Sequence, residues 1–405
     1  MKGSLLTLIL ALTACRALPI AECTVKCNAG TCAPSLTCGQ DGYCHGDGNI
    51  NCANSDGGAG DGGLVSGGPL NYVFLTKNSY TPGVDFKSIN DAHMICNTLA
   101  AASPILSGQY VVWLSDSTHD AKTQLGSAQG WIRPDGLPFA RTADHLTNDG
   151  ELFYPLLVDE TGSLSTALDI TVATATAASG SNEQQPSANN WTSNTGYLPG
   201  DAVETTAGWT DSGAGVTSKA AHLYCFGVGN TMNALNINKQ PGRVAFVSKD
   251  PFDPSSGRSA ADAQCQSEAV GNKNLPLGTY LALLSDTKKS AVSYFDISGP
   301  TWVRVDGIPW LKKASDLSQE AVLTSLNVDS AGDYLSFVRV WTGSQNAAAP
   351  SMSPAESCGD WSSGSMSQTA ETGSSYLASA QFFSDSSESC SMTALHIYCL
   401  QNSTE

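Results

Sequence analysis

The thirteen cysteines are the residues of this chain whose type and spacing most clearly indicate chemistry. Cys15 follows Leu12-Thr13-Ala14, at the end of an apolar run that starts at Leu5 behind a lysine. This pattern resembles the signal peptide and lipobox of a bacterial lipoprotein, in which the cysteine thiol takes a diacylglycerol. We therefore predict a signal peptide over residues 1–14 and a lipidated Cys15.

The cysteine count fits either of two signals. An ordinary signal peptide, cut after Ala17 or Ala21, is the alternative to the lipid anchor. Lipidation or removal of Cys15 leaves an even number of cysteines, which can pair completely. The apolar run is too short to span a bilayer permanently. We expect the mature protein outside the cytoplasm, where disulfides persist, as an outer-membrane lipoprotein at the cell surface or otherwise as a secreted protein.

Residues 15–55 predict a small cysteine-rich module. Little apolar material lies between its cysteines, so cross-links must hold it together. We predict three disulfides in a module loosely like an EGF domain. The sequence does not decide which cysteines pair with each other. A metal site is the rival, weakened because only His45 accompanies the cysteines. The Gly-rich residues 56–70 predict a flexible linker. The cysteines of the module are Cys23, Cys27, Cys32, Cys38, Cys44 and Cys52.

Residues 71–229 and 243–402 are two copies of one internal repeat, joined by the short polar linker 230–242. Each copy shows an early helical pattern followed by short β segments and Gly, Asn or Asp turns, which predicts two tandem α+β domains. We expect the linker to leave them some freedom. The landmarks are Tyr72-Val73-Phe74 with Val244-Ala245-Phe246, Leu114-Ser115-Asp116 with Leu284-Ser285-Asp286, Asp135-Gly136 with Asp306-Gly307, and His222-Leu223-Tyr224-Cys225 with His396-Ile397-Tyr398-Cys399.

The cysteines of the two copies predict their own pairing. The second copy has four cysteines and the first has only the outer two. Aligned on the landmarks, Ala188 and Val216 of the first copy stand opposite Cys358 and Cys390. Both inner cysteines are absent together, as expected of partners. The predicted bridges are Cys96–Cys225, Cys265–Cys399 and Cys358–Cys390.

Five motifs of the repeats are informative together: Gly278-Thr279-Tyr280, Asp306-Gly307-Ile308-Pro309-Trp310, Val340-Trp341-Thr342-Gly343, Cys358-Gly359-Asp360-Trp361 and the repeat endings at Cys225 and Cys399. They resemble the C-type-lectin-like fold, and more narrowly its endostatin branch. Both repeats are similar to a bacterial family of endostatin-like lipoprotein domains found in spirochaetes and myxobacteria. The resemblance implies two such domains after the small disulfide-rich module.

The resemblance implies recognition of an extracellular protein or glycan, as in an adhesin, through loops 164–191 and 344–361. The candidate contacts are Trp191, Trp361, Trp341 and Gln185, although we expect the tryptophans chiefly to pack the cores. Calcium-binding lectins hold the ion with a tripeptide that contains an acidic residue. The matching tripeptides here, Gln185-Pro186-Ser187 and Ser353-Pro354-Ala355, lack that residue. We predict no metal and no cofactor.

Charge and missing motifs narrow the function further. A net charge of −17 disfavours nucleic acid, and contact with a membrane is expected only through the anchor. The sequence holds no esterase elbow, zinc-protease helix, phosphate loop or dinucleotide fingerprint, so we predict a protein that is not an enzyme and has no catalytic residue. A structural envelope component without a soluble ligand is the rival, and a hydrolase on the same scaffold is a third option.

The remaining polar landmarks favour structural roles. His222 and His396 match each other and predict strand histidines with a satisfied hydrogen bond. Asp116 and Asp286 predict turn or cap residues. His93 finds no histidine at the matching place in the second copy.

Overall fold

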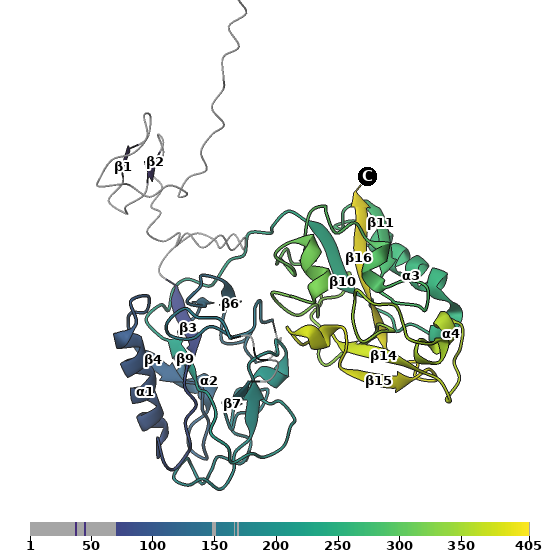
Figure 1. Ribbon diagram of the computed structural model, residues 1–405. Helices are drawn as coiled ribbons and strands as arrows, with labels where there is room; N and C mark the ends of the chain where they lie inside the picture. Colours follow the sequence, from purple (N-terminus) through teal and green to yellow (C-terminus); the bar gives the residue numbers. More distant parts are fainter. Residues whose placement is uncertain are drawn as a thin grey trace, which may run out of the picture. The chain divides into compact units, whose positions relative to one another are not determined.

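The computed structural model describes residues 37–38, 44–45, 70–147, 151–165, 167 and 170–404 (Figure 1). In the N-terminal unit, strands β1 (Thr37–Cys38) and β2 (Cys44–His45) pair antiparallel. The predicted lipid site at Cys15 and the pairing of the cysteine-rich module lie outside the described residues. Both repeats belong to one compact unit, Gly60–Glu405.

The first repeat is built on a five-stranded sheet in the order β4-β9-β3-β5-β6. Helix α1 lies along its edge strand β4 (Figure 1). Strands β7 and β8 form a separate two-stranded antiparallel sheet. The elements are β3 (Asn71–Leu75), α1 (Ile89–Ala102), β4 (Tyr110–Val112), α2 (Ala121–Gln124), β5 (Trp131–Ile132), β6 (Pro138–Ala140), β7 (Thr171–Ala173), β8 (Pro199–Asp201), η2 (Ala207–Trp209) and β9 (Tyr224–Gly227).

The second repeat has a seven-stranded sheet in the order β12-β10-β16-β13-β14-β15, with β11 also paired to β16. Its elements are β10 (Arg243–Val247), η3 (Pro254–Ser256), α3 (Arg258–Gly271), β11 (Gly278–Ala282), η4 (Ala291–Tyr294), β12 (Trp302–Arg304), η5 (Ala314–Gln319), β13 (Arg339–Trp341), η6 (Pro354–Glu356), α4 (Cys358–Trp361), β14 (Thr369–Ser374), η7 (Ala380–Phe382), β15 (Ser386–Ser389) and β16 (His396–Thr404).

The strand pairings of the two repeats correspond. The first strand of each repeat pairs parallel with β5 or β12 and antiparallel with the last strand, β9 or β16. That last strand also pairs antiparallel with the strand after the helix, β4 or β11. The fold is therefore mixed α+β, mostly sheet with few helices, as the sequence predicted.

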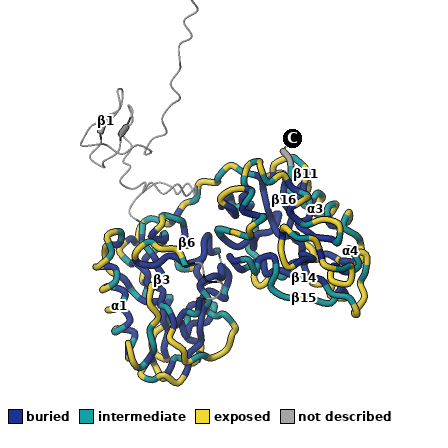
Figure 2. The backbone as a smooth tube through the Cα atoms, viewed as in Figure 1, coloured by how far each residue is buried: buried dark blue, intermediate teal, exposed yellow. Residues whose placement is uncertain are grey.

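The cores form because apolar residues recur at the spacing that each element requires. Ile89, Ala92, Cys96 and Ala100 recur at helical spacing, and they form the buried stripe of α1 (Figure 2). All eight tryptophans of the chain are buried. The sequence prediction that they pack the interior is therefore confirmed.

Three disulfides lie in the described part of the chain: Cys96–Cys225, Cys265–Cys399 and Cys358–Cys390. These are the pairings that comparison of the two copies predicted. The outer bridge of each repeat ties its helix to its last strand. The inner bridge ties α4 to the residue after β15, and only the second repeat has it.

The expected freedom between the repeats is not what the structure shows. Leu235 of the linker is buried in an apolar cluster with Phe153 and Tyr154 of the first repeat and Ile308 of the second. The Thr324 hydroxyl donates to the Phe153 carbonyl at 2.6 Å. Polar residues in the linker suggested solvent exposure, but its leucine and isoleucine positions instead fill the space between the repeats.

Candidate functional site

The three tryptophans proposed as ligand contacts have no exposed surface. Trp191, Trp341 and Trp361 are each 0% exposed. Their indole N–H groups donate to main-chain carbonyls of Ser115 (3.0 Å), Phe252 (3.2 Å) and Ser285 (2.8 Å). A stacking platform needs a solvent-facing ring, so the ligand role suggested for these tryptophans is wrong.

The fourth candidate, Gln185, is half-buried in the loop that precedes Trp191. Its main-chain N–H donates to the Asn182 carbonyl at 2.8 Å, and its carbonyl accepts from the Asn182 side-chain amide at 3.1 Å. These bonds fix the backbone of Gln185. A role of its side chain in ligand binding stays a prediction.

Each loop region ends in a left-handed turn. Residues 188–191 have φ between 51° and 67°, and residues 358–361 have φ between 51° and 66°. Side chains normally disfavour this conformation by roughly 1–2 kcal/mol per residue, although Asn, Asp and Gly tolerate it better. Asn189-Asn190 and Gly359-Asp360 fill the middle of the two turns.

The third residue of each turn holds the neighbouring loop. Asp360 accepts from the main-chain N–H of Thr287 at 2.9 Å and from its hydroxyl at 2.7 Å. In the first repeat Asn190 binds both the N–H and the hydroxyl of Ser117. The strained turn is therefore a fixed loop base in both repeats, and strain of this kind often accompanies a functional surface.

A cavity of about 430 Å³ opens beside this base in the second repeat. We call it the loop cavity. Its wall comes from the loop after β13 and from β14 and β15, so it includes the predicted loop 344–361. Its principal polar lining residues are Ser344, Gln345, Asn346, Glu356, Thr369 and Glu371.

The loop cavity begins at a glycine that the packing requires. Gly343 has φ +80°, and a Cβ there would lie 2.5 Å from the Trp361 ring and 2.7 Å from the Ser285 carbonyl oxygen. Its N–H and that of Thr342 both donate to the Glu371 carbonyl at 3.0 Å. These bonds fix the start of the loop against β14.

The rest of the loop is also held by long-range hydrogen bonds. The Ser351 N–H donates to the Asp286 carbonyl at 3.0 Å, and the Ala347 N–H donates to Glu320 Oε1 at 2.6 Å. The Cys358–Cys390 bridge ties the end of the loop to the residue after β15. The cavity is thus preformed, which lowers the entropy that a ligand would have to offset.

The lining of the loop cavity combines polar and apolar side chains, and its charged groups are acidic. Among the described residues that line it, none is Lys, Arg or His. Burial raises the pKa of Glu371, with Asp385 and Glu356 adding to the effect, while a hydrogen bond from Ser384 at 2.7 Å opposes it. Gln345, Asn346 and Glu356 are exposed and offer amide and carboxylate groups. Such a lining suits hydrogen bonding and disfavours an anionic ligand.

The first repeat does not reproduce this lining. Val172 pairs with Gly200 as Val340 pairs with Gly373, which places Leu198 opposite Glu371. Counting from the two turn tryptophans places Pro186 opposite Glu356. Both carboxylates belong to the second repeat alone, and a search for titratable motifs in the sequence missed them because they stand apart in the chain.

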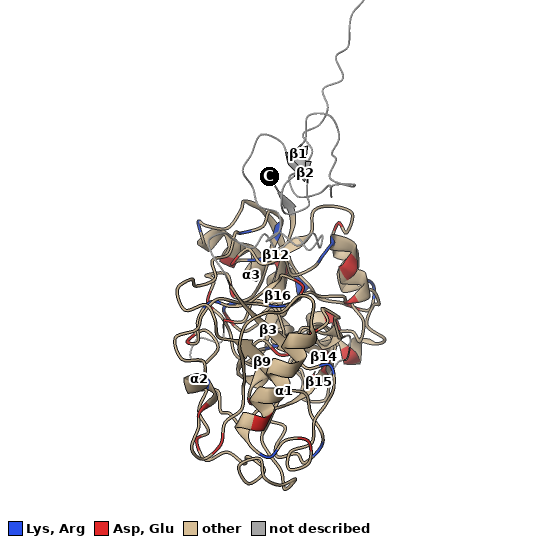
Figure 3. Cartoon of the chain, turned by 90° about the vertical axis from the view of Figure 1, so that its left-hand side faces the viewer, with Lys and Arg blue, Asp and Glu red and all other residues tan. Residues whose placement is uncertain are grey.

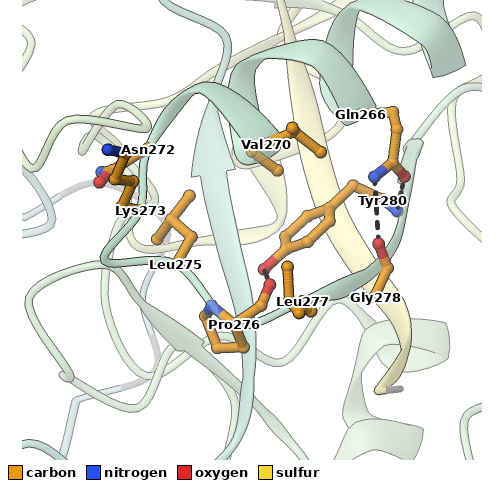
Figure 4. A pocket seen from close by; sticks show the side chains of 10 residues that line it. Gln266, Val270, Asn272, Lys273, Leu275, Pro276, Leu277, Gly278 and Tyr280 are labelled. Carbon is orange, nitrogen blue, oxygen red and sulfur yellow. Dashed lines mark hydrogen bonds between the residues drawn. The ribbon is translucent and has the colours of Figure 1, made fainter.

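A second pocket, of about 400 Å³, lies at the end of α3 (Figure 4). The ring of Tyr280 fills its floor, and its hydroxyl donates to the Pro276 carbonyl at 3.0 Å. Its exposed walls are aliphatic, with Val270 65% and Leu277 72% exposed. The loop cavity offers more polar partners for a specific ligand, so we take it as the candidate site.

Two comparisons with known proteins found no match for this chain. No protein-family model matches the chain, and no curated protein matches it. In the described residues, no helix has the length and apolar character needed to cross a membrane. The same residues contain no group of three or more His, Cys, Asp or Glu placed to hold a metal ion.

Proposed function

We propose that this chain is an extracytoplasmic surface lipoprotein with two lectin-like domains, and that it binds a protein or glycan ligand through the loop cavity of the second repeat. The observation that carries the proposal is the cavity itself: a preformed space of mixed polar and apolar lining between the loop, β14 and β15. The lectin-like assignment and the anchor at Cys15 rest on sequence motifs alone.

The charge distribution favours a neutral or cationic ligand. Lys and Arg are few and scattered in the view of Figure 3, and the chain carries 20 of them against 37 acidic residues. Two carboxylates border the cavity. A polyhydroxylated glycan or a basic peptide segment would find hydrogen-bond acceptors there, while a phosphate or sulfate group would be repelled.

The test is binding of the full chain to a printed glycan array and to a peptide array. Any ligand found is then titrated against Asn346→Ala and Glu371→Gln. We expect each change to weaken binding up to about tenfold, because Asn346→Ala removes a group that contributes about one hydrogen bond and Glu371→Gln removes a charge from the cavity lining.

Gln185→Ala, in the loop of the first repeat, is the matched control and should leave the affinity unchanged. Binding that survives both cavity changes would contradict the proposal. No ligand on either array would favour the rival function, a structural envelope component.

A further inference from the structure

The two repeats meet through matching segments. Residues 203–205 of the first repeat run antiparallel to residues 376–378 of the second, and we call this contact the seam. The Thr205 N–H donates to the Tyr376 carbonyl at 3.3 Å, and the Ala378 N–H donates to the Val203 carbonyl at 3.0 Å.

The seam has local two-fold symmetry. With Gly200 matched to Gly373, Val203 corresponds to Tyr376 and Thr205 to Ala378. The two hydrogen bonds therefore exchange when the repeats are exchanged. The residues that face each other at the centre, Glu204 and Leu377, correspond as well.

An ionisable side chain at this centre is an unusual choice. Glu204 is only 7% exposed. Its Oε2 atom has no hydrogen-bond partner, and a Cβ added to Gly208 would collide with it, so the carboxyl group fills a close-packed space. Leu377 of the other repeat is buried in the first repeat's core cluster, beside Val203 and Trp209.

Among the described residues around it, none supplies a positive charge to this carboxyl group. Its own repeat contributes Asp201, Asp211, the Tyr224 phenol and the Thr206 hydroxyl. The facing segment, residues 376–378, contributes only the Tyr376 phenol as a titratable group. A carboxylate here would carry a buried charge that no partner compensates. An uncharged carboxylic acid avoids that cost.

We propose that Glu204 makes the seam between the repeats pH-sensitive: the uncharged side chain closes the seam, and the carboxylate loosens it. The orientation of the two repeats, and with it the spacing of their loops, is then held more firmly in mildly acidic than in alkaline surroundings. This device does not depend on the proposed ligand.

The titration of Glu204 gives the pH window. Burial, together with the nearby Asp201 and Asp211, raises the pKa of Glu204 from its ordinary value of 4.5 to about 8, while the Thr206 hydroxyl acts to lower it. Between these two values the closed seam keeps a proton that the open seam loses. The seam is therefore most stable below pH 4.5, weakens as pH rises through the window, and changes no further above about pH 8.

Hydrogen exchange of the full chain tests this. The amides of Thr205 and Ala378 donate across the seam, so their protection factors, corrected for intrinsic exchange, report its opening. In the wild type we expect protection to fall by up to about tenfold per pH unit between pH 5.5 and 7.5. In Glu204→Gln, which keeps the shape and removes the charge, protection should not depend on pH.

Two controls keep the outcome specific. Glu320→Gln changes another carboxyl group whose pKa burial raises, but one that lies away from the seam, and it should leave the wild-type pH dependence intact. Glu204→Leu, which copies the facing Leu377, should give a pH-independent seam. Equal wild-type protection at both pH values, or unchanged pH dependence in Glu204→Gln, would overturn the proposal.

Discussion

Matching positions in the two repeats use different residues for the same bond. At the outer edge of β4, the main-chain N–H of Val112 donates to Nδ1 of His93 at 2.9 Å. In the second repeat Asp262 accepts from Ala282 in the same way, at 2.9 Å. His93 therefore has a counterpart after all, but one of another residue type. The predicted structural role of His222 and His396 is confirmed, because each Nδ1 lies 2.6 Å from a main-chain carbonyl.

His93 predicts a loss of stability in acid. Burial lowers the pKa of His93 from 6.5, and only the neutral ring can accept at Nδ1. As pH falls below 6.5 the unfolded chain gains a proton that the folded chain resists, so the contribution of His93 to stability declines, opposite in sign to that of Glu204, which is the same in both proteins compared. His93→Asp keeps an acceptor and should lose less stability between pH 7.5 and pH 5.5, measured by urea unfolding.

The control for this change is His119→Asn, at an exposed histidine. It should lose as much stability as the wild type over the same interval. An equal loss in His93→Asp and the wild type would show that His93 does not cause the acid sensitivity.

The loop base depends on backbone conformations rather than on side-chain chemistry. Two left-handed turns place Trp191 and Trp361 so that their indole groups reach the same main-chain position, Ser115 and Ser285. The loop that forms the cavity wall then leaves this base through Gly343. The cavity thus depends on a few positions that tolerate positive φ.

Gly343→Ala should destabilise the second repeat by about 2–4 kcal/mol, because the new methyl group meets both Trp361 and a carbonyl oxygen in a strained conformation. Gly332→Ala is the matched control: it also has positive φ (+94°), but its nearest neighbour is 3.8 Å away. It should cost only about 1 kcal/mol, for backbone strain alone. Urea unfolding compares the two, and equal costs would mean that the Trp361 contact is not tight.

The two repeats form a single packed unit. Their contact combines the Leu235 cluster with the seam, where Leu377 of the second repeat enters the core of the first. Comparison of the two copies in the sequence revealed the repeat, yet did not reveal that one copy packs on the other.

Leu377→Ala should uncouple the repeats. Removing a buried leucine costs about 2–5 kcal/mol, and here the loss falls on the contact that joins the repeats. We expect one calorimetric unfolding transition in the wild type and two in the variant. Leu125→Ala, in the core of the first repeat and away from the seam, should lower the stability of that repeat by a similar amount. A wild type that already unfolds in two steps would contradict this coupling.

The disulfide frame, the α+β class and the roles of the matched histidines could be predicted from the sequence. Comparing the two copies shows which cysteines are present or absent together, and the spacing of apolar residues shows which of them must be buried. The same comparison predicted that Asp116 would act in a turn, and its carboxylate does accept from the N–H groups of Thr118 and His119, both at 2.8 Å.

The candidate site was decided only by the tertiary structure. Loop 344–361 was predicted, but Glu371 lies on a later strand and reaches the cavity because β14 packs against the loop. The tryptophans of the loop motifs pack inward as predicted, but the main-chain carbonyls that accept from their indole N–H groups belong to distant segments, which the sequence did not show. Glu204 looks like any surface glutamate in the sequence. Its burial follows from the packing of one repeat on the other, and no local pattern encodes that contact.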